Sequence, residues 1–239
     1  MQNIVPLHGF GGVPYSAVRM AAPRNLLDNS DFTNLVAQAG IGGNHGTIQY
    51  AADRWILDSG TVSYEAGTGL TLNGTIRQKL EFPPTGDTSA FVGTASGEAS
   101  IVYADGEITI TSSGGVLEWA ALYAGTYSAA TMPDYKPKGY AAEMAECMRY
   151  FQIVRNGSGY VSSSNAYIFI QADMRVAPTA TVVITGSVRA NGKSVDADTV
   201  SAVSRFLPNS IRLTIPGDFS GSNYGACLFN ATIQLCADL

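Results

Sequence analysis

The sequence has few charged residues. Asp, Glu, Lys and Arg make up 14% of its 239 residues, against about 25% in an average globular domain. Long amphipathic helices need charged outer faces, so this shortage argues against an all-helical protein. The 14 Lys and Arg stand against 19 Asp and Glu, a net charge of −5, which is the wrong sign for binding nucleic acid. Hydrophobic residues still reach 46%, so the chain is not intrinsically disordered.

Long apolar runs are also missing. No stretch approaches the roughly 18 uninterrupted apolar residues of a membrane-spanning helix, so we expect no membrane insertion. The N-terminus has no early cationic region, and Pro6, His8 and Gly9 interrupt its apolar part, so we expect no export signal. Of the three cysteines, Cys227 and Cys236 fall at opposite ends of one predicted strand, too far apart for a disulfide. We therefore expect reduced thiols and synthesis in a cytoplasm.

Residue types that perform catalysis are scarce. There are two histidines, His8 near the N-terminus and His45 in a Gly-rich loop, and no nucleophile-elbow, P-loop or zinc-ligand motif accompanies them. No carboxylate pair stands out among the 19 acids, so we predict a protein that is not an enzyme and has no cofactor. One metal hypothesis is calcium held by Asp28, Asn29 and Asp31, because hard cations prefer oxygen ligands. The alternative, which we favour, is an Asx-rich turn that bonds its own backbone.

Residues 1–24 are apolar but interrupted by six glycines and prolines, which predicts an extended arm. An apolar arm must lie against its own domain or against another subunit, and we favour a partner surface. The predicted assembly contacts are Val5, Leu7, Phe10, Val13, Tyr15, Val18 and Met20.

Residues 25–135 have the pattern of a β domain. Short apolar stretches alternate with Gly, Asp, Asn and Pro at even spacing, which favours a jelly roll or β-sandwich. The largest aromatic side chains, Trp55 and Trp119, are expected in its core. We predict strands at 55–59, 61–66, 69–72, 76–82, 91–96, 98–103, 107–111 and 116–127.

Residues 136–152 are predicted to be a short linker helix, formed by Tyr140 to about Phe151. Its apolar positions recur at helical spacing, with Glu143 and Glu146 expected on the opposite side. The helix is too short to be stable alone, so we expect it to join two domains. The apolar stripe consists of Tyr140, Met144, Cys147, Met148 and Phe151.

Residues 153–239 are predicted to form a second β-sandwich, so the fold class is all-β throughout. Strands are expected at 167–174, 179–188, 200–206, 210–215 and 224–237. In the last strand, Cys227, Phe229, Ala231, Ile233 and Leu235 share one face, which the period-2 pattern marks as core.

Loops of this C-terminal domain combine tyrosine with Ser, Asn and Gly, the residue types of adaptable recognition surfaces. The alternative is that they are ordinary solvated hairpin turns. The predicted ligand-binding residues are Tyr160, Asn165, Asn191, Lys193, Asn223 and Tyr224.

Several motifs together resemble the jelly-roll proteins of phage tail fibres and prophage structural genes, and more loosely carbohydrate-binding modules. The motifs are NLLDNSDF at 25–32, YAADRW at 50–55, EWAALYAG at 118–125, AEMAECMRYF at 142–151 and FIQADMRVAPT at 169–179. The Gly-rich loop at 40–46 departs from the usual pattern, residues 1–24 are not covered, and the final third is covered only loosely.

The resemblance implies a virion component of a tail fibre, baseplate or head fibre, commonly a homotrimer, and not an enzyme. Its partners would be copies of itself, other virion proteins bound through the arm, and a host cell-surface glycan. Two alternatives remain open: a purely architectural decoration, neck or baseplate protein that binds no receptor, and a glycan-degrading enzyme with a carboxylate pair in a cleft.

Overall fold

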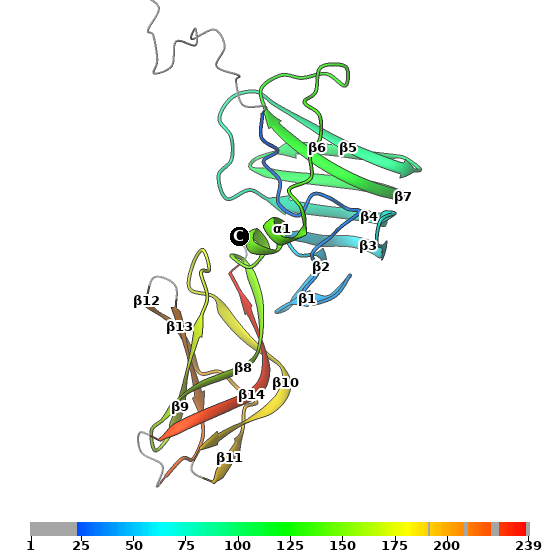
Figure 1. Cartoon of the computed structure of the whole chain (residues 1–239). Helices are drawn as coiled ribbons and strands as arrows, with labels where there is room; N and C mark the ends of the chain where they lie inside the picture. Colours follow the sequence, from blue (N-terminus) through cyan, green and yellow to red (C-terminus); the bar gives the residue numbers. More distant parts are fainter. Residues whose placement is uncertain (1–22, 191, 208–209, 221–224, 238–239) are drawn as a thin grey trace, which may run out of the picture.

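The computed structural model describes residues 23–190, 192–207, 210–220 and 225–237. These residues form two antiparallel sheets and one short helix, with the helix between the sheets (Figure 1). The predicted all-β class is therefore confirmed. The predicted arm contacts from Val5 to Met20 lie outside the described residues. Within the described part of the chain, no helix has the length and apolar character needed to span a membrane.

The N-terminal sheet has the strand order β1-β2-β3-β4-β7-β5, and β6 pairs with β7 beside β5. The long strand β7 therefore has β4 on one side and both β5 and β6 on the other. Eight short strands were predicted for this region. Three strands of the structure, β3, β4 and β7, are longer than predicted, because each continues through a gap that was expected between two short strands. The bounds are β1 Asn44–His45, β2 Ile48–Ala52, β3 Trp55–Glu65, β4 Gly69–Lys79, β5 Thr88–Ser96, β6 Ala99–Ala104 and β7 Glu107–Ala124.

Two paired glycines explain why β3 and β4 look interrupted in the sequence. Gly60 of β3 and Gly74 of β4 are direct partners, with φ angles of 90° and 144°. A Cβ on either one would collide with a backbone carbonyl of the opposite strand, that of Asn73 or that of Ser59. Next to them the β4–β7 register shifts between Leu72 and Asn73. Such bulges bend a sheet without ending its strands.

The N-terminal core lies between this sheet and the irregular segment before β1. Residues 26–32 run beside β7, where the amide of Phe32 donates to the carbonyl of Glu118 at 2.9 Å. Phe32 and Trp55 are fully buried, with their ring centroids 5.3 Å apart. Trp55 is thus in the core as predicted. The prediction for Trp119 was wrong, because it lies half-buried on the other face of β7 and stacks on Tyr135 with centroids 5.0 Å apart.

The helix α1 spans Tyr140–Cys147 and ends earlier than predicted, because Phe151 pairs with Cys236 in the C-terminal sheet. The predicted apolar stripe was also wrong: Tyr140 and Met148 are 46% and 40% exposed. Glu143, predicted to face outward, is buried with Cys147. It faces the N-terminal domain because its carboxylate accepts a 2.6 Å hydrogen bond from the amide of Asn29.

The C-terminal sheet has the order β11-β10-β14-β8-β9-β13-β12. Strands β8 and β9 pair over only four residues each, and the sheet curls there so that its halves enclose one core (Figure 1). The predicted core face of the last strand, Cys227 to Leu235, is confirmed. Sequence analysis missed β8 and β11. The bounds are β8 Phe151–Val161, β9 Asn165–Gln171, β10 Thr179–Ala190, β11 Lys193–Asp196, β12 Ala202–Leu207, β13 Ser210–Pro216 and β14 Ala226–Cys236.

Direct contacts join the two domains. The ring of His45 in β1 lies between Tyr50 and Phe151, with centroid distances of 3.9 and 3.6 Å, and its Nε2 lies 3.3 Å from Oδ1 of Asp53. The amide of Gly46 donates to the side chain of Gln234 in β14 at 3.1 Å. The base of the C-terminal domain is therefore held against β1 by a buried aromatic stack and by hydrogen bonds.

Candidate binding surface

Of the six predicted ligand-binding residues, the structure describes three, and one of these, Tyr160, lies in a group of aromatic side chains. Asn191, Asn223 and Tyr224 lie outside the described residues. Asn165 donates to the neighbouring Ser164 hydroxyl, as expected of a solvated turn. Lys193 donates to the carbonyl and hydroxyl of Ser220. The structure groups Tyr160 with two further aromatic residues, and this group is the starting point for the site.

Three half-buried rings form an aromatic strip on the outside of the C-terminal sheet, made of Tyr160, Tyr167 and Phe169. The centroids of Tyr160 and Tyr167 are 4.9 Å apart, and those of Tyr160 and Phe169 are 5.8 Å apart with the ring planes 26° from parallel. Strand alternation produces this arrangement, because the intervening residues Ala166 and Ile168 point into the core. The three rings therefore pack against one another and leave part of their surface exposed.

A polar groove of about 710 Å³ lies on β8, β10, β11 and β14. The register of β14 shifts here against β8, between Asn230 and Ile233, and against β10, between Ile184 and Ser187. Irregular pairing of this kind opens a sheet surface. The groove is lined mainly by amide, hydroxyl and charged side chains: Arg155, Asn156, Ser187, Asp196, Asn230 and Thr232.

The groove and the strip share one side of the sheet, which we call the outer face. Cross-strand pairs connect the groove with the strip. In the groove, Asn230 of β14 is the partner of Asn156 of β8. Two residues away on the same two strands, Leu228 is the partner of Ser158. Ser158 is in turn the partner of Phe169 in the strip. Leu228 is 67% exposed. The exposed Leu228 and the aromatic strip thus lie next to the polar groove on the outer face.

One cation is positioned against the strip. Arg212 of β13 is the cross-strand partner of Phe169, and its guanidinium lies 5.5 Å from the ring centre of Tyr167. The negative face of the ring attracts the cation. Arg212 is therefore held on the outer face at the edge of the aromatic strip.

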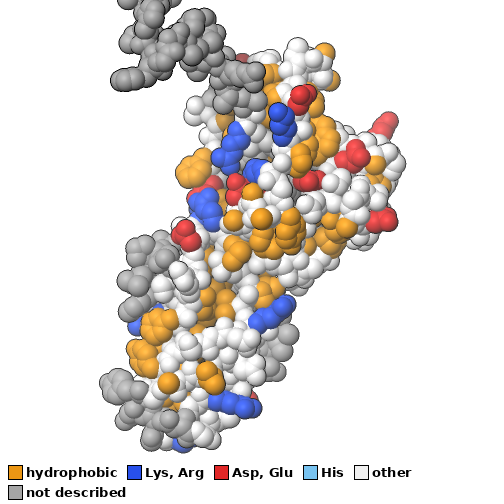
Figure 2. All heavy atoms as spheres, in the orientation of Figure 1, with side chains coloured by type: hydrophobic (Ala, Val, Ile, Leu, Met, Phe, Trp, Pro, Cys, Tyr) orange, Lys and Arg blue, Asp and Glu red, His pale blue; other side chains and the backbone are white. Residues whose placement is uncertain are grey.

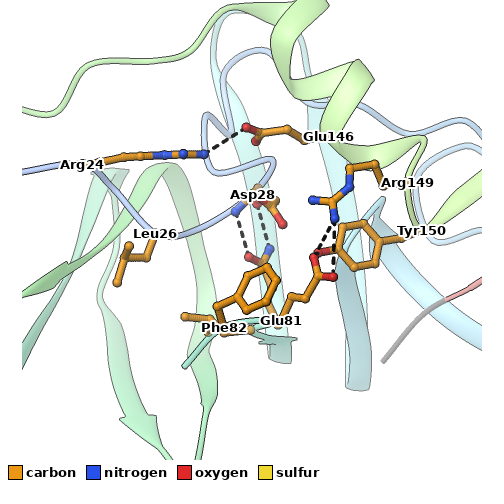
Figure 3. A pocket seen from close by; sticks show the side chains of 10 residues that line it. Arg24, Leu26, Asp28, Glu81, Phe82, Glu146, Arg149 and Tyr150 are labelled. Atoms are coloured by element: carbon orange, nitrogen blue, oxygen red, sulfur yellow. Dashed lines mark hydrogen bonds and ion pairs between the residues drawn. The ribbon is translucent and has the colours of Figure 1, made fainter. Parts of the chain in front are cut away.

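A second pocket, of about 250 Å³, lies where α1 meets the N-terminal domain (Figure 3). Its charges compensate one another: Arg24 pairs with Glu146 at 3.2 Å, and Arg149 pairs with Glu81 at 3.0 Å. The hydroxyl of Tyr150 donates to Glu81 at 2.8 Å, and burial raises the pKa of this tyrosine. Cations thus hold the acids of this pocket in salt bridges.

The predicted metal candidates have protein partners. Asp28 faces Arg54 and Lys138, at 3.3 and 3.6 Å. Oδ1 of Asp31 accepts from the amide and hydroxyl of Thr33 at 3.1 and 2.7 Å, which is the Asx turn that we favoured. Asn29 is fully buried and bonds backbone groups. Across the described ranges, no group of three or more His, Cys, Asp or Glu side chains is placed to hold a metal ion.

Cys147 and His45, the thiol and the imidazole nearest the domain junction, are buried. The thiol of Cys147 is fully buried, and desolvation strongly raises its pKa. His45 is 2% exposed within its aromatic stack. Cys227 and Cys236 form no disulfide among the described residues, as expected. His8 lies outside the described residues.

Comparison of the chain with known protein families, with curated proteins and with solved structures gives no match. The likeness to jelly-roll virion proteins therefore stays a prediction carried by the motifs quoted above.

Proposed function

We propose that this protein is a non-enzymatic component of a phage-like virion, which binds a host-surface carbohydrate on the outer face of its C-terminal domain. The observation that carries the binding function is the aromatic strip of Tyr160, Tyr167 and Phe169 beside the polar groove. The assignment to a virion rests on the motif resemblance.

Saccharides present two kinds of surface, and the outer face offers a partner for each. The C–H groups on the face of a sugar ring pack on an aromatic ring, whose face carries partial negative charge. The hydroxyl edge needs short donors and acceptors, and Asn156, Ser187 and Asn230 supply these in the groove. Because the sheet curls between β8 and β9, a polymer that touches both the aromatic strip and the polar groove has to follow the curved outer side of the sheet.

Two observations support a binding protein in preference to a glycan-degrading one. Glycoside hydrolysis uses an accessible carboxylate pair of which one member is protonated. The acids of the pocket beside α1 are instead paired with arginines. The carboxyl of Glu143, whose pKa is raised by burial, is 2% exposed and out of reach of a substrate.

The test is a glycan array, followed by calorimetry of the strongest hit, with the full-length protein. The double variant Tyr160→Ala/Tyr167→Ala should weaken binding at least tenfold, because removing a central aromatic contact costs more than about 1.4 kcal/mol. Tyr140→Ala is the matched control, since this tyrosine is 46% exposed on α1 and should not affect binding.

Circular dichroism should show that all variants keep the fold. If the unmodified protein binds no glycan, the proposed binding function is wrong, and the architectural alternative takes its place.

A further inference from the structure

The arginines from Arg24 onward whose side chains the structure describes fall into two groups. Those of the N-terminal domain and of the junction between the domains have acidic partners within 4 Å: Arg24 with Glu146, Arg54 with Asp28, Arg77 with Asp58 and Glu107, and Arg149 and Arg175 with Glu81. In contrast, Arg155, Arg189 and Arg212 form no ion pair with any described residue.

Arg155, Arg189 and Arg212 lie on the outer face. Arg155 lines the polar groove. Arg189 and Arg212 end a row that crosses five adjacent strands, in which each residue is the direct partner of the next: Arg189, Leu228, Ser158, Phe169 and Arg212. With strands spaced about 4.8 Å apart, the ends of this row are about 19 Å apart along the sheet.

Charge is distributed unevenly along the chain. Residues 153–239 contain six Lys and Arg, five Asp and no Glu, whereas residues 1–152 contain eight Lys and Arg and 14 acids. Figure 2 shows the acidic side chains mainly on the N-terminal domain. One acid, Asp196, lines the groove with Arg155, so the outer face carries more positive than negative charge.

Arg212 has an additional feature. Its Nε is buried and has no hydrogen-bond partner among the described residues, although an unsatisfied buried donor is costly. The half-buried side chain is held over Tyr167 rather than being directed at an acid. A planar guanidinium in this state is suited to a bidentate contact with a carboxylate or phosphate.

Resting on the proposed function, we infer that the carbohydrate bound by the outer face is anionic, a saccharide that bears carboxylate or phosphate groups. Its rings lie on the aromatic strip, and Arg155, Arg189 and Arg212 contact its charged groups. No acid among the described residues forms an ion pair with these three arginines, so they can pair with an anionic ligand.

The experiment is calorimetry of the full-length protein with hexagalacturonate, with its uncharged methyl ester and with phosphorylated pentamannose, at low and high salt. At least one of the two anionic probes should bind at least tenfold more tightly than the ester. If hexagalacturonate is the tighter probe, the face recognises carboxylate groups, and if phosphorylated pentamannose is the tighter probe, it recognises phosphate groups. Arg155→Gln, Arg189→Gln and Arg212→Gln should each weaken this binding at least tenfold, because one hydrogen bond between charged groups contributes that much or more. Added salt should weaken it as well.

Lys79→Gln is the matched control, because it removes one exposed charge from β4 of the N-terminal domain. It should leave the affinity unchanged. Arg212→Lys keeps the charge but lacks the planar fork, so its affinity should lie between those of the unmodified protein and Arg212→Gln. Thermal melts of all variants show whether a loss of binding comes from unfolding.

Three outcomes would overturn the inference, and they are distinguishable. If the ester and the acid bind equally and Tyr160→Ala/Tyr167→Ala abolishes this binding, the proposed glycan-binding function stands, but the inference that the glycan is anionic is wrong. Absence of binding to every saccharide removes both. Duplex DNA bound as tightly as the anionic saccharide, with the same losses in the arginine variants, means that the face binds polyanions in general.

Discussion

Asn29 offers the sharpest test of how the N-terminal domain is held together. It is fully buried and has a φ of 49°. Its side-chain amide donates to the carbonyls of Val36 and Asp53 at 2.8 and 2.7 Å and accepts from the amide of Val36 at 2.9 Å. Its backbone carbonyl accepts from Nε1 of Trp55, and its backbone amide donates to Glu143.

Replacing Asn29 by alanine removes three side-chain hydrogen bonds. Each contributes about 1 kcal/mol, and the backbone partners left behind are buried. Alanine at positive φ adds strain of about 1 kcal/mol. We therefore expect Asn29→Ala to lower the free energy of unfolding by about 4 kcal/mol. Asn29→Gly loses the same hydrogen bonds but tolerates the backbone angle, so it should be about 1 kcal/mol more stable than the alanine variant.

Urea unfolding followed by tryptophan fluorescence measures this domain, because both tryptophans lie in it. A loss below about 1 kcal/mol in Asn29→Ala, or a glycine variant less stable than the alanine variant, would refute the reasoning.

The same urea-unfolding assay tests the calcium hypothesis. If calcium stabilises the unmodified protein and a chelator destabilises it, Asp28, Asn29 and Asp31 have a role that their contacts in the structure do not explain.

Two further predictions concern pH and assembly. Burial raises the pKa of Glu143, so its contribution to stability is full below its unfolded pKa, about 4.3, and is lost as the pH rises through the folded value. Glu143→Gln should therefore melt at a higher temperature than the unmodified protein at pH 7 and no higher at pH 4, and equal destabilisation at both pH values would contradict this. The motif resemblance implies a homotrimer, so light scattering should give three times the chain mass of 25.1 kDa, and a monomer at micromolar concentration would count against that expectation.

Local patterns predicted the parts of the fold that local physics determines. The alternation from Cys227 to Leu235 was sufficient, because each apolar residue of β14 faces the core in turn.

Glycines led to two errors in the predicted strands. Gly60 and Gly74 have the same sequence signature inside a bent sheet as in a turn. In β8, Gly159 packs so closely on Tyr167 that a Cβ would meet its carbonyl, and a strand built for such close approach has no apolar alternation to detect.

The candidate site depends on register, which the sequence does not display. Tyr160 was predicted from the composition of its loop, but nothing in the chain indicated that Tyr167 and Phe169 would lie beside it. Likewise, Glu143 was assigned to the wet side of the helix, because a carboxylate is normally exposed. Its partner is the backbone amide of Asn29, 114 residues away in sequence, and a contact of that kind has no signature in either segment.

Strands β8 and β14 connect the two ends of the C-terminal domain. Phe151 and Gln234 make the contacts with the N-terminal domain, while Tyr160 and Leu228, nearer the opposite ends of the same strands, belong to the outer face. Nine residues separate Phe151 from Tyr160, which is about 30 Å of extended strand. The buried stack around His45 therefore fixes the direction of the two strands that carry much of the outer face. The proposed binding function needs this combination, because a binding face on a particle can reach its ligand only if its attachment to the rest of the molecule sets its orientation.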